Sequence, residues 1–561
     1  MQVTGSEAVI LSLLEEHTET IFGYPGGAIM PIYDALYDYR ERINHILVRH
    51  EQGAVHAAEG YARIKGKPGI CLVTSGPGAT NLVTGLADAM IDSIPLVCIS
   101  GQVASPLLGS DAFQETDVIG ITMPVTKWNY QITKASEIPE TIAKAFYLAS
   151  TGRPGPVMLD ITKDAQFATI EYSYRKCKKL RSYFPYPKVR EDDIEAAKIL
   201  INNARKPMIL AGHGVLIANA QEELMQLAEK SDIPVAMTLM GLSAFPTNHR
   251  LYAGLLGMHG NLAPNINTNE CDLLIAVGMR FDDRITGDLN TYAKQAAIIH
   301  IEIDPSEVNK NVEVDVKVVA DARQALSALL PGITRRQNTE WIDSFNKFKD
   351  EEYDKVILDK VNGKSPEIKM EEIVEEVCRK TEGNAIVVTD VGQNQMVAAR
   401  TYRFNHPNSW VTSGGLGTMG FGLPASIGAK IARPERTVVL FVGDGGFQMT
   451  IQELGTIAQS GVDVKIIVMN NRFLGMVRQW QDMFFEKRYS FTEISSPDFI
   501  RVAEAYGIKG CRASSREEMA VAIDEQMSHK GPFLVEVMVE KEANVLPMVP
   551  PGESVSNVRL E

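Results

Sequence analysis

Short apolar runs alternate with stretches of helical spacing along most of this 561-residue chain. The runs at residues 70–73, 96–99 and 438–442 are each followed by Gly, Ser, Thr or Asp, and a segment with helical periodicity comes after. This alternation is typical of parallel α/β folding. Because a single core stops growing at roughly 250–300 residues, a chain of this length is expected to form several domains.

The apolar runs fall into three blocks, which predict an α/β protein made of three doubly wound parallel-sheet domains. We place these domains at residues 1–172, 190–332 and 365–544, followed by a tail at 545–561. A basic, Pro-containing stretch at 174–192 is interpreted as a linker, and a charged helical stretch at 339–360 leads to the third block. The expected strands lie at residues 19–26, 45–51, 69–78, 95–102 and 155–161, then 206–215, 233–239, 272–281 and 297–304, then 385–392, 409–415, 437–446, 464–471 and 532–539.

Charge and cysteine content narrow the setting. The formal net charge is −14, which argues against a nucleic-acid partner. The six cysteines are scattered with no Cys-x-x-Cys, and this fits a reducing cytoplasm without a disulfide framework. The first residues do not read as a signal or transit peptide, and no apolar run reaches the ~18 residues that a membrane span needs.

Two polar motifs follow neighbouring apolar runs in the third block. Gly443-Asp444-Gly445-Gly446 comes directly after the apolar run at residues 438–442, and Asn470-Asn471 comes directly after the apolar run at residues 464–469. Alone, each is typical of a turn or a helix cap. Together, at the carboxyl ends of two parallel strands, they suit a phosphate and its Mg²⁺, since that ion takes carboxylate, amide and carbonyl oxygens. We therefore expect a metal site formed by Asp444, Asn471 and the carbonyl of Phe473. The helix after the first motif is expected at residues 450–461, with its positive end toward the phosphate.

This pair of motifs resembles that of thiamin diphosphate enzymes, and the likeness extends along the chain. The segments "GYPGGA", "RHEQGAVHAAEGYAR", "TSGPGATN", "DAFQETD", "RFDDRITG", "SGGLGTMGFGLPA" and "NNRFLGMVRQWQ" occur in this order. They resemble the catalytic subunits of acetohydroxyacid synthase, the biosynthetic acetolactate synthase. The resemblance implies a pyrimidine-binding first domain, an FAD-binding-like middle domain and a diphosphate-binding third domain.

By this resemblance, Glu51 activates the cofactor by holding its pyrimidine ring, and a buried carboxylate there needs such a partner. Asn394 stands where the family commonly has His, and an amide cannot act as an acid near neutral pH. Met419 would wedge the cofactor into a bent form. The implied cofactor contacts are Tyr24, Pro25, Gly26, Pro77, Asn81, Gly392, Gln393, Asn394, Gly417, Met419, Gly443, Asp444, Gly445, Gly446, Asn471, Gly475 and Met476.

The resemblance also assigns residues to the reacting carbons. Phe113, Gln114 and Lys127 are expected to face them, and Gly27 leaves room for substrate. Taken singly, each of the first three suits an ordinary core or surface position. Arg280 suits a substrate carboxylate bidentately, although a surface pair with Asp282 or Asp283 is the plainer alternative. Trp480 and Met476 would line the pocket beside Arg280.

A second cofactor is implied in the middle domain. The run "RFDDRITG" is associated with FAD in this family, whereas catabolic acetolactate synthases are not expected to carry it. We expect bound FAD without a net redox role. Its candidate contacts are Arg153, Gly212, Gly214, His259, Arg280, Arg284, Ile285, Asp304 and Asp321.

The function implied is decarboxylation of pyruvate and condensation of the hydroxyethyl unit with a second pyruvate or 2-oxobutanoate, in branched-chain amino acid biosynthesis. The alternatives are a pyruvate oxidase, a glyoxylate carboligase, a catabolic acetolactate synthase, or a flavin-binding module without catalysis. Implied partners are a homodimer or homotetramer with sites between subunits, and a small regulatory subunit. The segment "GQVASPLLG" departs from the frequent "GQVPRRMIG" at Ala104 and Pro106, which leaves herbicide sensitivity open. The tail after Val545 is a possible lid.

Overall fold

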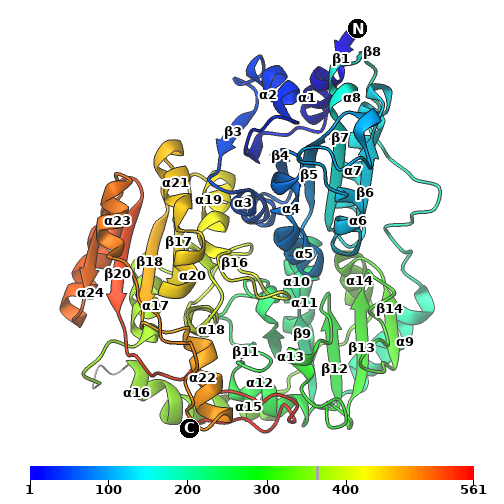
Figure 1. The fold of residues 1–561 in the computed structure, drawn as a ribbon. Coiled ribbons are helices and arrows are strands. Elements are labelled where there is room, and N and C mark those ends of the chain that lie inside the picture. Colours follow the sequence, from blue (N-terminus) through cyan, green and yellow to red (C-terminus); the bar gives the residue numbers. More distant parts are fainter. Residues whose placement is uncertain (362–364) are drawn as a thin grey trace.

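The computed structural model describes residues 1–361 and 365–561 and contains three six-stranded, all-parallel sheets, each covered by helices (Figure 1). The interior strands of each sheet are buried on both faces, as continuous apolar runs require, whereas edge strands such as β3 and β19 are partly exposed. The expected α/β class with three parallel-sheet domains is confirmed. Within the described residues, no helix has both the length and the apolar character to cross a membrane.

The first sheet has the order β3-β2-β4-β5-β7-β6. The first and last strands of this domain, β1 and β8, form a separate small antiparallel pair. Its strands are β1 (Gln2–Thr4), β2 (Thr20–Gly23), β3 (Asn44–Leu47), β4 (Gly69–Val73), β5 (Leu96–Gln102), β6 (Trp128–Ile132), β7 (Pro156–Thr162) and β8 (Thr169–Glu171). Its helices are α1 (Gly5–Glu15), α2 (Met30–Tyr37), α3 (Glu51–Lys65), α4 (Pro77–Thr80), α5 (Val83–Asp92), α6 (Val118–Thr122), α7 (Ile138–Ser150) and α8 (Lys163–Phe167).

The second sheet has the order β11-β10-β9-β12-β13-β14. Its strands are β9 (Pro207–Ala211), β10 (Val235–Met237), β11 (Tyr252–Leu255), β12 (Leu273–Val277), β13 (Ala297–Glu302) and β14 (Val316–Val319). The helices are α9 (Glu191–Asn203), α10 (His213–Ile217), α11 (Gln221–Ser231), α12 (Leu262–Thr268), α13 (Asp283–Thr286) and α14 (Ala322–Leu329). A connecting segment follows, with α15 (Thr339–Glu352), a π-helical turn (Tyr353–Ile357) and α16 (Leu358–Val361).

The third sheet has the order β16-β15-β17-β18-β20-β19. Its strands are β15 (Ile386–Thr389), β16 (Trp410–Val411), β17 (Val438–Gly443), β18 (Lys465–Asn470), β19 (Lys509–Ala513) and β20 (Phe533–Met538). The helices are α17 (Met370–Thr381), α18 (Gln393–Thr401), α19 (Gly422–Ala432), α20 (Asp444–Met449), α21 (Leu454–Ser460), α22 (Gly475–Phe484), α23 (Phe499–Ala505) and α24 (Arg516–Ser528).

The first and third domains pack on each other through α3 and α19, near the centre of Figure 1. Two glycines allow the close approach. A methyl group on Gly60 would overlap the carbonyl of Ala425, and one on Gly428 would overlap the carbonyl of Ala57. The two helices therefore meet backbone to backbone, which fixes the relative position of the two domains.

The tail crosses from the third domain to the middle domain, as the red segment at the bottom of Figure 1 shows. The N–H of Val549 donates to the carbonyl of Met258 at 2.8 Å, and the N–H of Asp288 donates to the carbonyl of Glu553 at 2.9 Å. Val555 is buried in the core of the middle domain. The tail is thus docked beside the loops around residues 258 and 285.

Candidate functional site

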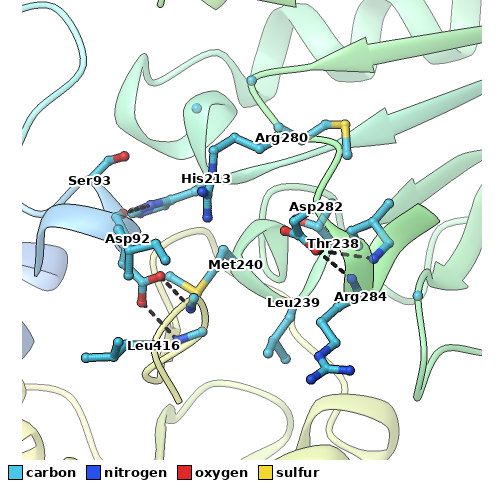
Figure 2. Close-up of a pocket in the computed structure, with 18 of the residues that line it drawn as sticks. Asp92, Ser93, His213, Thr238, Leu239, Met240, Arg280, Asp282, Arg284 and Leu416 are labelled. Atoms are coloured by element: carbon cyan, nitrogen blue, oxygen red, sulfur yellow. Dashed lines mark hydrogen bonds between the residues drawn. The ribbon is translucent and has the colours of Figure 1, made fainter. Parts of the chain in front are cut away.

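A cavity of about 790 Å³ lies where the three domains meet. The first domain contributes the end of α5 and the loop around Arg153, the middle domain contributes the loops after its strands, and the third contributes the loop at 414–419 and α22. Figure 2 shows Asp92 and Leu416 on one side of this cavity and Arg284 and Asp282 on another. Ligands of open parallel sheets bind beyond the carboxyl ends of the strands, and this cavity occupies such a position.

The turn after β17 carries the first polar motif. Asp444 begins α20 and is completely buried. Its Oδ2 accepts a hydrogen bond from Ser496 Oγ at 3.1 Å, while Oδ1 is buried without a partner among the described residues. Burial raises the pKa of Asp444 to about 6. A buried oxygen left unpaired in this way is well suited to a cation. The helix expected over residues 450–461 is present as a 3₁₀ turn (Ile451–Glu453) followed by α21, but the helix whose N-terminus meets the motif is the additional α20, which begins at Asp444.

The second polar motif lies next to the first because β17 and β18 are adjacent, with Gly443 opposite Met469. Asn471 is buried, and its Oδ1 accepts from the N–H of Phe473 at 3.1 Å. Its Nδ2 donates to Gln393 Oε1 at 3.4 Å. The structure therefore brings Asp444, Asn471 and Phe473 to one edge of the sheet.

The loop before α18 packs against the site formed by Asp444, Asn471 and Phe473, because Gln393 at the start of α18 accepts from Asn471. Gly392 has a φ of 146°, a conformation that side chains with a Cβ rarely adopt. Asn394 uses its amide to hold the backbone: Nδ2 donates to the carbonyls of Asp390 at 2.9 Å and Phe441 at 3.0 Å. Met419 lies nearby, since a Cβ on Gly445 would be 3.8 Å from its Cε. Asn394 is thus a structural clamp in this loop.

Glu51 is the first residue of α3 and is partly buried. Its Oε2 accepts a hydrogen bond from Asn81 Nδ2 at 2.9 Å, and a Cβ on Gly78 would lie 3.3 Å from Oε1. Pro77 opens the short helix between them. The turns after β3 and β4 thus bring Glu51, Pro77 and Asn81 together, as the resemblance implies they should be.

The loop after β2 is more open. Tyr24 is 41% exposed, and a Cβ on Gly27 would meet no atom within 4 Å. Gly26 and Pro25 lie beside it, with Gly26 packed against Thr74. Phe113 is 88% exposed, which is unusual for such a large apolar side chain. Gln114 follows it in the left-handed region, with a φ of 58°.

Lys127, which is also expected to face the reacting carbons, is partly buried and is held by backbone carbonyls. Its Nζ donates to the carbonyls of Leu148 and Thr151 at 2.6 Å each and of Arg153 at 2.8 Å. Burial lowers the pKa of Lys127 to about 8. Its ammonium group therefore holds the loop between α7 and β7, and orienting a substrate would require it to leave these carbonyls.

The residues expected to choose the second substrate do line the cavity. Arg280, Met476 and Trp480 all belong to its wall. The guanidinium carbon of Arg284 lies 6.0 Å from the centre of the Trp480 ring, which adds a cation–π contact. Burial raises the pKa of Asp282 above its ordinary value. The positive charge of nearby Arg280 opposes this effect but is the smaller of the two.

Seven of the nine residues expected to hold FAD line the same cavity, and two do not. His259 is the most telling of the seven, because its Nδ1 is buried without a partner among the described residues and burial lowers its pKa to about 3. Gly212 and Asp304 lie behind the wall: the N–H of Gly212 donates to the carbonyl of Val277 at 2.9 Å, and Asp304 accepts from Arg153 Nη1 at 3.2 Å. The seven in the wall are Arg153, Gly214, His259, Arg280, Arg284, Ile285 and Asp321.

Sequence reasoning missed other residues in this wall, among them Asp92, His213 and Met240. Asp92 ends a helix and His213 starts one, so each has an ordinary local explanation. Their contacts come from distant parts of the chain, and only the Gly-rich neighbourhood of His213 gives a local signal.

Comparison with known families places this geometry in a class. Residues 3–121 match the N-terminal TPP binding domain of thiamine pyrophosphate enzymes, residues 194–329 match the central domain, and residues 390–537 match the C-terminal TPP binding domain. The chain thus has the three-domain organisation of a thiamine pyrophosphate enzyme.

Full-length relatives narrow the class. The chain is 46% identical to the acetolactate synthase large subunit of Haemophilus influenzae, covering 98% of this chain and 96% of that one. It is 44% identical to the isozyme 2 large subunit of Escherichia coli, covering 99% of each. A probable acetolactate synthase large subunit of Methanocaldococcus jannaschii is 46% identical over 99% of this chain and 95% of its own length. The chain therefore belongs to the acetolactate synthase large-subunit family, which confirms the resemblance read from the motifs.

Proposed function

We propose that this protein forms 2-acetolactate from two molecules of pyruvate, or 2-aceto-2-hydroxybutyrate from pyruvate and 2-oxobutanoate. Family membership over nearly the whole chain carries the proposal, since the relatives named above are acetolactate synthases. The reaction would serve branched-chain amino acid biosynthesis in the cytoplasm. Thiamin diphosphate, when bound, supplies the carbanion nucleophile and accepts the electrons released with CO₂.

Mg²⁺ is proposed to bind Asp444, Asn471 and the carbonyl of Phe473. The unpartnered Oδ1 of Asp444 supports this assignment, because a buried carboxylate oxygen needs a cation or a proton. Asp444 supplies negative charge, and Asn471 supplies a neutral oxygen with a free lone pair beside the Phe473 N–H. The glycines at 443, 445 and 446 leave backbone exposed to the diphosphate.

Glu51 is proposed to hold the pyrimidine ring and shift its proton. In the chain itself, Glu51 does not belong to the wall of the three-domain cavity, whereas Met419 and Met476 of the third domain do. The first-domain side therefore has to meet the third domain of a second copy. A homodimer with two shared sites is the minimal assembly proposed, and a homotetramer is a dimer of such dimers. Phe113, Gln114 and Tyr24 would then become covered by the second copy.

FAD is proposed to occupy the cavity without a net redox role. The support is the size of the cavity, the guanidinium groups of Arg153 and Arg284 at its wall, and the orphaned Nδ1 of His259. Charged and polar groups at a few points of a mostly apolar wall are the usual composition of a cofactor site. The docked tail closes the side near Met258, and we propose that it acts as a lid there.

Arg280 is proposed to bind the carboxylate of the second 2-oxoacid, with Trp480 beside its alkyl group. Both side chains line the cavity, and the planar guanidinium matches a carboxylate bidentately. Lys127 is proposed to act only indirectly, by holding the loop that carries Arg153. A small regulatory subunit is proposed as a partner because the relatives are named large subunits.

A product assay tests this function. Purified protein with thiamin diphosphate, Mg²⁺ and FAD should release CO₂ from pyruvate and form acetolactate without oxygen uptake. Acetyl phosphate with oxygen uptake would identify a pyruvate oxidase instead. The Glu51→Gln variant should bind Mg²⁺ and the diphosphate but lose most turnover, and full retention of turnover would contradict the role of Glu51.

A further inference from the structure

The loop between β16 and α19 is held by two acids of the first domain. We call residues 413–419 the glycine loop. The carboxylate of Asp92 accepts from the backbone N–H of Gly414 at 2.9 Å and from that of Gly415 at 2.8 Å. One turn earlier on α5, Asp88 Oδ1 accepts from Ser413 Oγ at 2.7 Å. Three consecutive loop residues are therefore bonded to one helix of another domain, beside Leu416 in Figure 2.

The charge of Asp92 is balanced by a buried cation. Arg63 Nη2 donates to Asp92 Oδ2 at 2.7 Å, and the two side chains are 4% and 1% exposed. The guanidinium group of Arg63 also lies 5.5 Å from the centre of the Phe421 ring, just after the loop. A buried carboxylate with a cation and two backbone donors has one favourable arrangement, so it defines where those donors lie.

The backbone of Asp92 reaches the middle domain. His213 Nδ1 contacts the carbonyl oxygen of Asp92 at 3.2 Å, as Figure 2 shows. Burial lowers the pKa of His213 to about 4, so the ring is neutral near pH 7 and Nδ1 carries the hydrogen. His213 opens α10 and lines the cavity. Asp92 thus contacts all three domains.

The glycine loop packs closely against its neighbours. A Cβ on Gly415 would lie 2.8 Å from Ile91 Cγ1, and one on Gly414 would overlap the sulfur of Met240. Thr418 is tied back into the loop, because its N–H donates to Ser413 Oγ at 2.8 Å. Any change at Asp92 must therefore pass to the residues that follow.

We propose that Asp92 is a positioning residue that holds the glycine loop in the conformation that binds thiamin diphosphate. We further propose that, through the contact between Asp92 and His213, this conformation depends on whether FAD occupies the cavity where the three domains meet. The inference rests on the proposed function in one respect, namely that Gly417 and Met419 touch that cofactor. Met419 is at the end of the loop and beside Gly445, so a displaced loop moves it relative to the diphosphate motif. An occupied cavity buttresses His213 and Asp92, and through them the loop.

The first test is the affinity for thiamin diphosphate, measured by quenching of intrinsic fluorescence at saturating Mg²⁺ and without pyruvate. Asp92→Asn keeps the shape of the side chain but turns an amide toward N–H groups and removes the charge opposite Arg63. The Kd should rise at least about tenfold, since hydrogen bonds to a charged group are lost. Asp38→Asn, an exposed acid after α2, is the matched control and should change nothing. A Kd within twofold of the parent protein in Asp92→Asn would overturn the proposal.

The second test separates positioning from mere stability. In the parent protein, saturating FAD should tighten thiamin diphosphate binding about fivefold or more, and thiamin diphosphate should tighten FAD binding by the same factor. His213→Ala removes the contact with the carbonyl of Asp92 but keeps the carboxylate contacts with Gly414 and Gly415, so the coupling factor measured at saturating FAD should fall toward one. An undiminished factor in His213→Ala would contradict the coupling.

A third variant keeps the proposal testable if Asp92→Asn fails to fold. If Asp92→Asn does not fold, Gly415→Ala pushes the loop away from Ile91 without altering any charge, and it should weaken thiamin diphosphate binding in the same way. Unchanged binding in Gly415→Ala would overturn the proposal on its own. Because every measurement is made without substrate, a parent protein that binds the cofactor but forms no acetolactate would contradict only the proposed function.

Discussion

The two ends of the proposed thiamin diphosphate site differ within one chain. The diphosphate end is fully formed within one chain: Asp444 and Asn471 are buried, and they are hydrogen-bonded to Ser496 and Gln393 respectively. The pyrimidine side is open, with Phe113 88% exposed. A second copy packed on this side, as proposed above, would cover Phe113. The comparison supports the proposal that one chain builds the diphosphate-binding end by itself and that a second copy completes the pyrimidine-binding end.

Removing the charge at the diphosphate end should have the largest effect. Asp444→Ala deletes the only carboxylate proposed as a metal ligand, so we expect acetolactate formation to fall more than about 100-fold at ordinary Mg²⁺ concentrations. A Mg²⁺ titration of product formation measures this. Glu435→Gln is the control, because Glu435 is exposed before the opposite end of β17. Normal Mg²⁺ dependence in Asp444→Ala would place the metal elsewhere.

Mixing two inactive variants tests whether the open end is completed by a second copy. If each site takes Glu51 from one subunit and Asp444 from the other, Glu51→Gln and Asp444→Ala subunits form heterodimers with one intact site. Random pairing makes half of the dimers mixed, so activity should return to about a quarter of the parent value.

The mixing experiment has a clear contrary outcome. Activity that stays at the level of the single variants, while mixed dimers are detected by differently tagged subunits, would mean that Glu51 and Asp444 serve the same site of one chain. Glu435→Gln subunits mixed with Asp444→Ala subunits provide the control for subunit exchange.

The contrast between the two ends also shows what sequence reasoning can reach. The two motifs predicted to bind the diphosphate, Gly443-Asp444 and Asn470-Asn471, lie at the ends of two adjacent interior strands, and short apolar runs predict such strands well. Among the described residues, six strands lie outside the expected ranges: β1 and β8, which form the small antiparallel pair, and β6, β11, β14 and β19, which are edges of the six-stranded sheets. Edge strands such as Lys509–Ala513 carry polar and partly exposed residues, so their pattern is not continuously apolar.

Residues whose neighbours are remote in sequence were the other failure. Lys127 is predicted to face substrate, but the three carbonyls that accept from it belong to the end of α7 and the loop after it, more than twenty residues away. Asp92 carried no motif, because its partners lie on a glycine loop in a different domain. Local patterns identify side chains that end strands, whereas domain packing decides which other side chains meet them.

The pH dependence of metal binding sharpens the comparison further. The pKa of Asp444 is raised from 3.8 to about 6 by burial, so the metal-free folded protein holds a proton that the unfolded chain releases. The contribution of this group to folding stability is therefore present below pH 3.8 and is lost as the pH rises through 6. Mg²⁺ must displace the proton, so its apparent affinity should fall about tenfold per pH unit below pH 6.

Fluorescence titrations with Mg²⁺ and thiamin diphosphate between pH 5 and 7.5 measure this dependence. Ser496→Ala removes the hydrogen bond that favours the ionised form, so the midpoint should move to higher pH. A midpoint that does not respond to Ser496→Ala would assign the titration to another group.

The smallest expected effect is a change in product ratio on substitution of Trp480, which lines the cavity where the second substrate is proposed to bind. Trp480→Leu enlarges the space beside Arg280 and removes the ring under Arg284, without touching the metal ligands. Because one methylene in such a pocket is worth about 1–3 kcal/mol, the preference for 2-oxobutanoate over pyruvate should fall by a factor of about ten while CO₂ release stays near the parent rate. The product ratio with both 2-oxoacids present measures the effect, and Met483→Ala, on the same helix but outside the cavity wall, is the matched control. A ratio that changes equally in both variants would show that Trp480 acts through the packing of α22 rather than by contact with the second substrate.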